Sequence, residues 1–150
     1  MRSHFQTPDW VCDMMTGMLY EYDVVNVLEP TPGDGNLVKS LKCSGFNVTA
    51  PKDFFSISGK YDAVVMNPPF TPMEKGYEIL GMVMGMSSIV IALMPWLTII
   101  NSEKRTKSIM NHGLKSITHL PRNAFPGSRV QTCIMEIIKD YDGKTIFSCV

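Results

Sequence analysis

The chain has 150 residues, of which 45% are hydrophobic, which is enough to bury the core of one compact domain. Lysine and arginine together number 14, as do aspartate and glutamate, so the formal net charge of zero excludes a global field that would attract nucleic acid. Any nucleic-acid binding must therefore come from a local basic patch or from a partner.

The cysteines show neither the spacing of a metal site nor the density of a disulfide-stapled secreted domain. They are Cys12, Cys43, Cys133 and Cys149. The histidines also lack ligand spacing with these cysteines. They are His4, His112 and His119. We therefore expect no metal site and a reducing, cytoplasmic setting.

One segment has the length and apolar character of a membrane span. Residues 81–100 are almost free of charge. Ser87, Pro95 and the β-branched cluster at 89–91 instead favour the end of a helix followed by a buried strand. Residues 1–9 are polar and do not resemble a signal peptide. We therefore expect no membrane association.

The first half of the chain alternates helix and strand patterns. Residues 8–20 have apolar residues at helical spacing, with Thr7 as the predicted N-cap and Pro8 as the first helical residue. The elements predicted after this helix are a strand at 24–29, a short helix at 37–45 and strands at 46–50 and 62–66. Very little chain lies between the last two strands.

The second half continues the alternation and ends in two strands. The predicted elements are a helix at 72–86, a strand at 89–93, a helix at 102–112 and strands at 115–120 and 131–139. The short loop between the final two strands suggests an antiparallel pair at one edge. Continuous apolar strands alternating with helices indicate an α/β fold with a mostly parallel sheet covered on both faces.

A glycine-rich turn follows the first predicted strand. Glu29 ends the strand, and Pro30, Gly33 and Gly35 lie in the turn before the next helix. Ligands of open α/β sheets bind outside the carboxyl ends of the strands, where glycine lets the backbone turn sharply and approach a ligand. The acidic side chain could pair there with an ammonium group. A turn without a ligand would have the same pattern, so this motif alone leaves both interpretations open.

The tetrapeptide Asn67-Pro68-Pro69-Phe70 directly follows a buried strand. Its prolines stiffen the backbone, which suits a preorganised site. The Asn67 side-chain oxygen and the Pro68 carbonyl could accept both hydrogens of an exocyclic amino group and favour its attack on a methyl sulfonium. Phe70 could stack on a base flipped out of its helix. The alternative is a strand stop followed by a core phenylalanine.

The order of these motifs resembles the S-adenosylmethionine-dependent amino-methyltransferases, a family that includes the N6-adenine DNA methyltransferases. The resemblance covers nearly the whole chain and implies a Rossmann-like fold, with residues 1–150 as one minimal catalytic domain. It implies a catalytic role for Asn67, Pro68, Pro69 and Phe70. It implies S-adenosyl-L-methionine as cofactor, bound by Thr7, Pro8, Glu29, Pro30, Gly33, Gly35 and Asn67. For Thr7 and Pro8, a plain helix start explains the residues equally well.

The sequence departs from this family in two places. The family usually has a helix and a third strand between the second strand and the one before the NPPF motif, and here both are short or missing. Asp53 could take the role of the ribose-binding or the adenine-binding residue, and Phe54 could stack on the adenine. No target-recognition domain follows the catalytic residues, so we expect a specificity subunit or a second copy of the chain to assist.

Several basic residues could contact nucleic acid. They are Lys104, Arg105 and Lys107 in the predicted helix, and Arg122 and Arg129 around Phe125 in the following loop. A solvated helix face and a core aromatic are the alternatives. The predicted activity is methylation of an exocyclic amino nitrogen, with adenine N6 in DNA as the leading acceptor. An RNA base, a protein glutamine amide, or a cofactor-binding subunit without activity remain as alternatives.

Overall fold

The computed structural model describes residues 6–150, so His4 lies outside the described residues. Its centre is a seven-stranded sheet in the order β2-β1-β3-β4-β6-β5-β7. The strands are β1 (Asn26–Leu28), β2 (Asn47–Thr49), β3 (Ala63–Met66), β4 (Ile89–Pro95), β5 (Leu114–His119), β6 (Thr132–Ile138) and β7 (Ile146–Cys149). The helices are α1 (Asp9–Gly17), α2 (Asn36–Cys43), α3 (Met73–Met84), α4 (Leu97–Ile100) and α5 (Glu103–Gly113). Short 3₁₀ helices are η1 (Met18–Glu21), η2 (Phe54–Ser56) and η3 (Arg122–Ala124).

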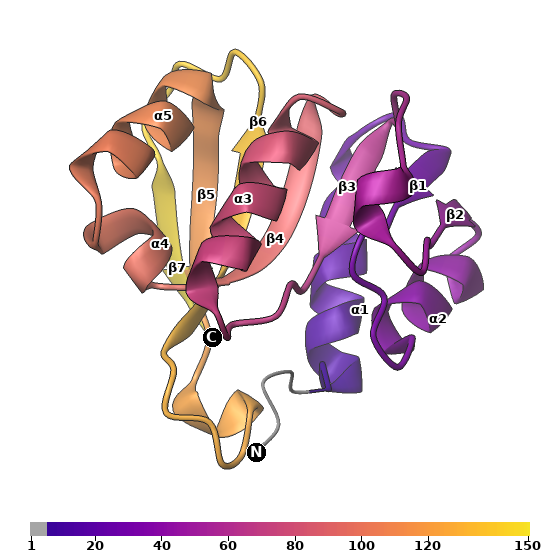
Figure 1. Cartoon of the computed structure of the whole chain (residues 1–150), viewed down its shortest axis with the longest axis horizontal. Helices are drawn as coiled ribbons and strands as arrows, with labels where there is room; N and C mark the ends of the chain where they lie inside the picture. Colours follow the sequence, from indigo (N-terminus) through magenta and orange to yellow (C-terminus); the bar gives the residue numbers. More distant parts are fainter. Residues whose placement is uncertain (1–5) are drawn as a thin grey trace.

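The sheet is covered on both faces, as predicted. Helices α1 and α2 pack on one face, while α3 and α5 pack on the other (Figure 1). Alternation along the central strands supplies both layers: Val90, Ala92 and Met94 of β4 enter one core, and Ile91 and Leu93 enter the other. This double burial explains the long apolar run at 81–100, which spans the end of α3, all of β4 and α4. Within residues 6–150, no helix has the length and apolar character needed to cross a membrane.

Strand β6 is the one strand that runs against its neighbours. It pairs antiparallel with β4 and β5, whereas β1, β2, β3 and β4 pair in parallel. The predicted antiparallel pair of the last two expected strands is therefore confirmed. Strand β7, which the sequence did not predict, pairs in parallel with β5 and forms the outer edge. All four of its residues are exposed, so the strand leaves no buried hydrophobic pattern in the sequence.

The start of α1 differs from the prediction. The carbonyl of Pro8 accepts the first helical bonds, from the amides of Val11 and Cys12, at 3.1 and 3.0 Å. Pro8 is thus the N-cap, and the Thr7 side chain does not cap the helix. Thr7 is buried, and its hydroxyl bonds instead to Asn67, which lies sixty positions further along the chain. The prediction of a Thr7 cap was wrong because a tertiary contact uses the hydroxyl.

The middle of the fold is shortened, as the sequence indicated. Between β2 and β3 the described chain forms only η2, with Asp53 as its N-cap through a 3.0 Å bond from the Phe55 amide. Strand β2 is therefore the other edge of the sheet. The loop that contains η2 lies at the carboxyl end of β2, near the end of β1, and this proximity brings the candidate site together.

Candidate functional site

The carboxyl ends of β1, β2 and β3 surround a cavity of about 530 Å³. The glycine turn after β1 supplies one wall, the η2 loop a second, and the NPPF segment with the start of α3 a third. The lining includes Pro30, Thr31, Gly33, Asp53, Phe54, Phe55, Pro69 and Lys75. Four of the residues predicted to bind a cofactor and one predicted catalytic residue therefore line a single cavity. Its place in the sheet is where open α/β folds bind ligands.

Glu29 is a buried acid at the end of β1, with only 1% of its surface exposed. Its Oε1 accepts hydrogen bonds from the Thr31 amide at 2.7 Å and from the Thr31 hydroxyl at 3.3 Å. Burial raises the pKa of Glu29 to about 8, and the bonds from Thr31 oppose this shift. In the described residues no lysine or arginine forms an ion pair with it. A ligand cation, such as an ammonium group, would offset the cost of ionising it.

The glycine turn adopts backbone conformations that other residues rarely take. Gly33 and Gly35 have φ angles of 54° and 92°, and Gly35 is the N-cap of α2. Left-handed φ values are strained for residues with a Cβ atom. Glycine at these positions lets the chain reverse between β1 and α2, which keeps Pro30 and Gly33 against the cavity.

Asn67 is 4% exposed and lies directly after β3. Its Nδ2 donates to the Thr7 hydroxyl at 2.6 Å, and no described residue donates to its Oδ1. The Pro68 carbonyl also receives no bond from a described backbone amide. Helix α3 approaches this segment closely: a Cβ atom on Gly76 would lie 3.1 Å from the Pro69 carbonyl oxygen. Two acceptors therefore stand free on a backbone that is held by prolines and a packed helix.

The three phenylalanines near the site differ in exposure. Phe70 and Phe54 are 7% and 5% exposed, whereas Phe55 is 49% exposed and lines the cavity. Phe54 packs edge-on against Phe55, with ring centroids 5.4 Å apart. Sequence analysis passed over Phe55. The doubled aromatic after Asp53 was the available signal, because successive side chains of a 3₁₀ helix such as η2 point about 120° apart, so both cannot face the same way.

Two lysines of the cavity were also missed. Lys52 precedes Asp53 in the η2 loop, and Lys75 lies in the first turns of α3. Both are exposed at the rim. Asp53 is exposed as well and uses one carboxylate oxygen on the Phe55 amide. The rim therefore carries charges of both signs, whereas the buried acid Glu29 precedes the lining residue Pro30 and does not itself line the cavity.

A second cavity, of about 670 Å³, lies at the carboxyl end of β4. Its lining includes Met73, Trp96, His119, Arg129, Gln131 and Phe147. Trp96 Nε1 donates to His119 Nδ1 at 2.8 Å, and the Trp96 ring packs edge-on against Phe147 at 5.7 Å. No acidic side chain among residues 6–150 lines it. Stacking surfaces with a nearby guanidinium suit a nucleobase and its phosphate.

The predicted nucleic-acid residues are not brought together. Phe125 is 3% exposed and belongs to the core, so it offers no stacking surface here. Arg105 donates to the Thr98 and Leu97 carbonyls at 2.8 and 3.0 Å and lies over the Tyr77 ring, which ties α5 to α4 and α3. Lys107 pairs with Glu103 on the exposed face of α5. Lys104 and Arg122 are exposed, and of the set only Arg129 lines a cavity with aromatic walls.

The fold is that of the Rossmann-like S-adenosylmethionine-dependent methyltransferases. One similar structure is a Listeria monocytogenes protein that is assigned to class I of these enzymes. The match covers all of this chain and 67% of the Listeria chain, at 13% identity and a TM-score of 0.76. The methyltransferase subunit of a type I restriction-modification system from Streptococcus thermophilus matches 97% of this chain, at 13% identity and a TM-score of 0.74. The 23S rRNA methyltransferase ErmE matches 91% of it, at 15% identity and a TM-score of 0.63.

These similarities establish the architecture. The chain spans two thirds of the length of the Listeria protein and 47% of the Streptococcus subunit. No protein-family model and no curated protein sequence matches it.

Proposed function

We propose that the chain is an S-adenosylmethionine-dependent N-methyltransferase that acts on an exocyclic amino nitrogen of nucleic acid, with adenine N6 in DNA as the leading acceptor. The observation that carries this proposal is Asn67: a buried amide at the carboxyl end of β3 whose Oδ1, like the carbonyl of the adjacent Pro68, accepts no bond from a described residue. Two acceptors fixed in this way can bind both hydrogens of one amino group. They favour the geometry that its nitrogen adopts as it attacks.

Residues in and next to the first cavity fit the proposed cofactor; Glu29 does not line the cavity itself but directly precedes the lining residue Pro30. Glu29 is a buried acid that a cationic ammonium group would stabilise, and Phe55 offers an exposed ring for an adenine. Asp53 lines the same cavity and is exposed, which supports a role as acceptor for a ribose hydroxyl. When bound, S-adenosylmethionine supplies an electrophilic methyl group on a sulfonium. The chain's own residues hold the acceptor nitrogen, and its surplus proton passes to solvent because neither an amide nor a carbonyl can take it.

A nucleic-acid acceptor is supported by the second cavity. Trp96, Phe147 and Arg129 surround a space next to Met73, only three residues beyond Phe70. Substrate held at this cavity would lie beside the NPPF segment. Phe70 itself is buried, so a base that stacks on it would require a local shift of the segment.

Target selection is proposed to come from another chain. Base-specific readout needs an element that fills a groove, and the predicted nucleic-acid residues do not gather at one place in the described part of the chain. A specificity subunit or a second copy could supply this element.

The decisive experiment incubates the purified chain with labelled S-adenosylmethionine and unmethylated DNA, RNA or protein, and identifies the modified residue by mass spectrometry. Asn67→Ala should lower the single-turnover rate on the order of 100-fold while cofactor affinity changes little. Asn111→Ala, at an exposed position of α5, is the matched control. If the label appears on a protein glutamine amide, the acceptor is protein and the proposal of a nucleic-acid acceptor is wrong. Binding of the cofactor without transfer to any acceptor would support a non-catalytic subunit.

A further inference from the structure

Thr7 connects two loops of the site through both of its oxygen atoms. It is 4% exposed, and its Oγ1 accepts from Asn67 Nδ2 at 2.6 Å. Its carbonyl oxygen accepts from Asn36 Nδ2 at 2.9 Å. Asn36 is the first residue of α2, directly after the glycine turn, whereas Asn67 ends β3. One residue therefore links the cofactor side of the site to the acceptor side.

The bond to Asn67 has a directional consequence. An asparagine amide presents an oxygen that only accepts and a nitrogen that only donates. Because Nδ2 is directed at Thr7, Oδ1 is turned away from it and stays free of bonds from described residues. If the Asn67 amide rotated by half a turn, its Nδ2 would face the acceptor amino group. Both groups would then present hydrogens, and no hydrogen bond could form between them.

We propose that Thr7 is a positioning residue that holds the Asn67 amide with its oxygen toward the acceptor amino group. This inference rests on the proposed function. The link through Asn36 fixes the Thr7 backbone to the start of α2, so the amide is oriented relative to the loop that holds the cofactor. Thr7 acts through Asn67 and does not itself contact the reacting atoms.

A direct role in binding the cofactor carboxylate makes a different prediction for the same residue. If the Thr7 hydroxyl bound the cofactor, its loss would weaken cofactor affinity. If it orients Asn67, its loss would slow transfer at saturating cofactor and leave affinity nearly unchanged. The hydroxyl accepts from Asn67 Nδ2, which supports orientation, but its own hydrogen is still available to a carboxylate, so the measurement of cofactor affinity separates the two roles.

Three variants separate these roles. Thr7→Val keeps the shape but removes the acceptor, Thr7→Ser keeps the hydroxyl, and Thr16→Val is the matched control. Thr16 is also a buried threonine with a side-chain bond, to the Ser40 hydroxyl at 3.0 Å, and it lies within α1. The single-turnover rate of Thr7→Val should fall roughly tenfold, the value of one lost hydrogen bond. Its S-adenosylmethionine Kd should stay within about twofold of that of the wild type.

Thr7→Ser should recover most of the rate, and Thr16→Val should retain it. An unchanged rate in Thr7→Val, or a loss confined to cofactor affinity, would overturn the positioning role while the proposed function stands. A wild-type chain that methylates no acceptor would overturn both.

A second measurement does not depend on activity or on the folding of a variant. In ¹⁵N spectra of the wild-type chain, the side-chain amide protons of Asn67 should exchange with water much more slowly than those of exposed Asn111. Equal exchange at the two positions would show that Asn67 is not held by Thr7.

Discussion

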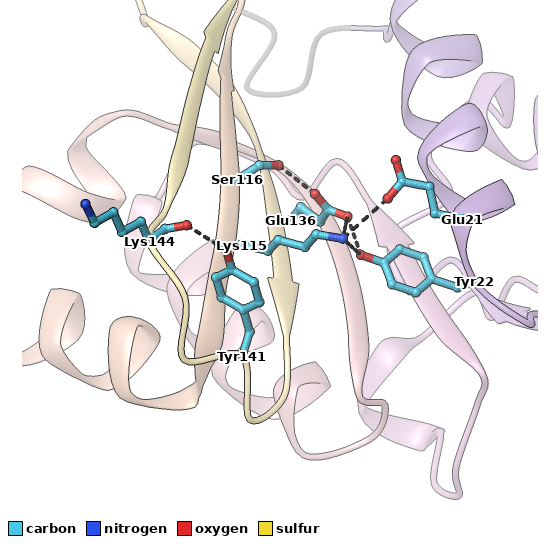
Figure 2. A network of polar contacts seen from close by, with 7 residues as sticks. All are labelled: Glu21, Tyr22, Lys115, Ser116, Glu136, Tyr141 and Lys144. Carbon is cyan, nitrogen blue, oxygen red and sulfur yellow. Dashed lines mark hydrogen bonds and ion pairs between the residues drawn. The ribbon is translucent and has the colours of Figure 1, made fainter.

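The Tyr22 hydroxyl donates a hydrogen bond of 2.5 Å to Oε2 of Glu136, which joins the segment after η1 to the middle of β6. Lys115 Nζ lies 3.0 Å from the same hydroxyl, and the Ser116 hydroxyl donates to Glu136 Oε1 at 2.7 Å (Figure 2). Glu136 is only 7% exposed, so these partners compensate the burial of its carboxylate. This network lies on the α1 side of the sheet, away from both cavities.

Tyr22→Phe should therefore destabilise the fold, because it removes a donor from a buried carboxylate. We expect a loss of about 1–3 kcal/mol in the free energy of unfolding, measured by urea denaturation. Tyr20→Phe is the matched control, since Tyr20 is 65% exposed. Equal stability of the two variants would mean that Lys115 and Ser116 alone compensate the burial of the Glu136 carboxylate.

Glu29 should make stability fall as pH rises. Burial raises its pKa from 4.5 to about 8, so the folded chain keeps a proton that the unfolded chain releases. The stability that this group contributes is complete below about pH 4.5 and is lost as pH approaches 8. Glu29→Gln cannot ionise and should gain stability relative to the wild type across this interval, on the order of a few kcal/mol. Urea unfolding at several pH values measures the difference, and a difference independent of pH would contradict the buried acid.

Cofactor binding should release a proton at pH 7. An ammonium group beside Glu29 favours the carboxylate, which is mostly protonated in the free chain when its pKa is about 8. Calorimetric titration with S-adenosylmethionine in two buffers of different ionisation enthalpy should show release of nearly one proton. Glu29→Gln should show none. If the wild type binds the cofactor without releasing a proton, the cofactor ammonium group does not lie beside Glu29.

Two glycines should respond to alanine in opposite directions. A Cβ atom on Gly113 would lie 1.9 Å from the Ile138 carbonyl oxygen, and its φ angle is 138°. Gly113→Ala should cost roughly 3 kcal/mol or more of unfolding free energy. Gly81 lies in α3 with no neighbouring atom within 4 Å of an added Cβ, so Gly81→Ala should stabilise by up to about 1 kcal/mol. Thermal or urea unfolding of both variants tests the pair.

The isolated chain should bind single-stranded nucleic acid weakly and with little sequence preference. Its zero net charge gives no general attraction, so we expect a Kd of roughly 10–100 μM at physiological salt. Binding should quench Trp96 fluorescence in a Trp10→Phe background. Arg129→Ala should reduce the slope of log affinity against log salt by about 0.7, whereas Lys139→Ala, at the amino-terminal end of the parallel strands, should not. Nanomolar binding of one defined sequence by a monomer would show that recognition is built into this chain.

Local patterns predicted much of the fold. The apolar runs before Glu29 and before Asn67 are strands because both of their faces are buried, and their period and length mark them in the sequence. The turn glycines and the paired prolines ended these strands at the expected places. The short segment between β2 and β3 has no room for a helix and a further strand, which is a matter of length alone.

Other features depend on segments that lie far apart in the sequence. Strand β7 is exposed, and it forms by pairing with the free edge of β5. Its own residues therefore show no hydrophobic pattern that would predict a strand. The sequence around Phe125 does not distinguish an exposed phenylalanine from a buried one. Its burial depends on the residues that pack around it in the folded chain. Arg105 likewise lies in a charged helix, but its guanidinium bonds to a carbonyl of α4 and packs on the Tyr77 ring, so it is only partly exposed.

The sequence by itself therefore determined the buried strands, the glycine turn and the NPPF segment, because backbone stiffness and hydrophobic period are local properties. Tertiary structure alone decided which side chains meet at the site. It brought the Thr7 hydroxyl to Asn67, and it left Phe55 half exposed while burying Phe54, although both rings line the cavity. The orientation of a side chain depends on partners brought together by the whole fold, and a hydrogen bond across sixty positions leaves no periodic trace in the sequence.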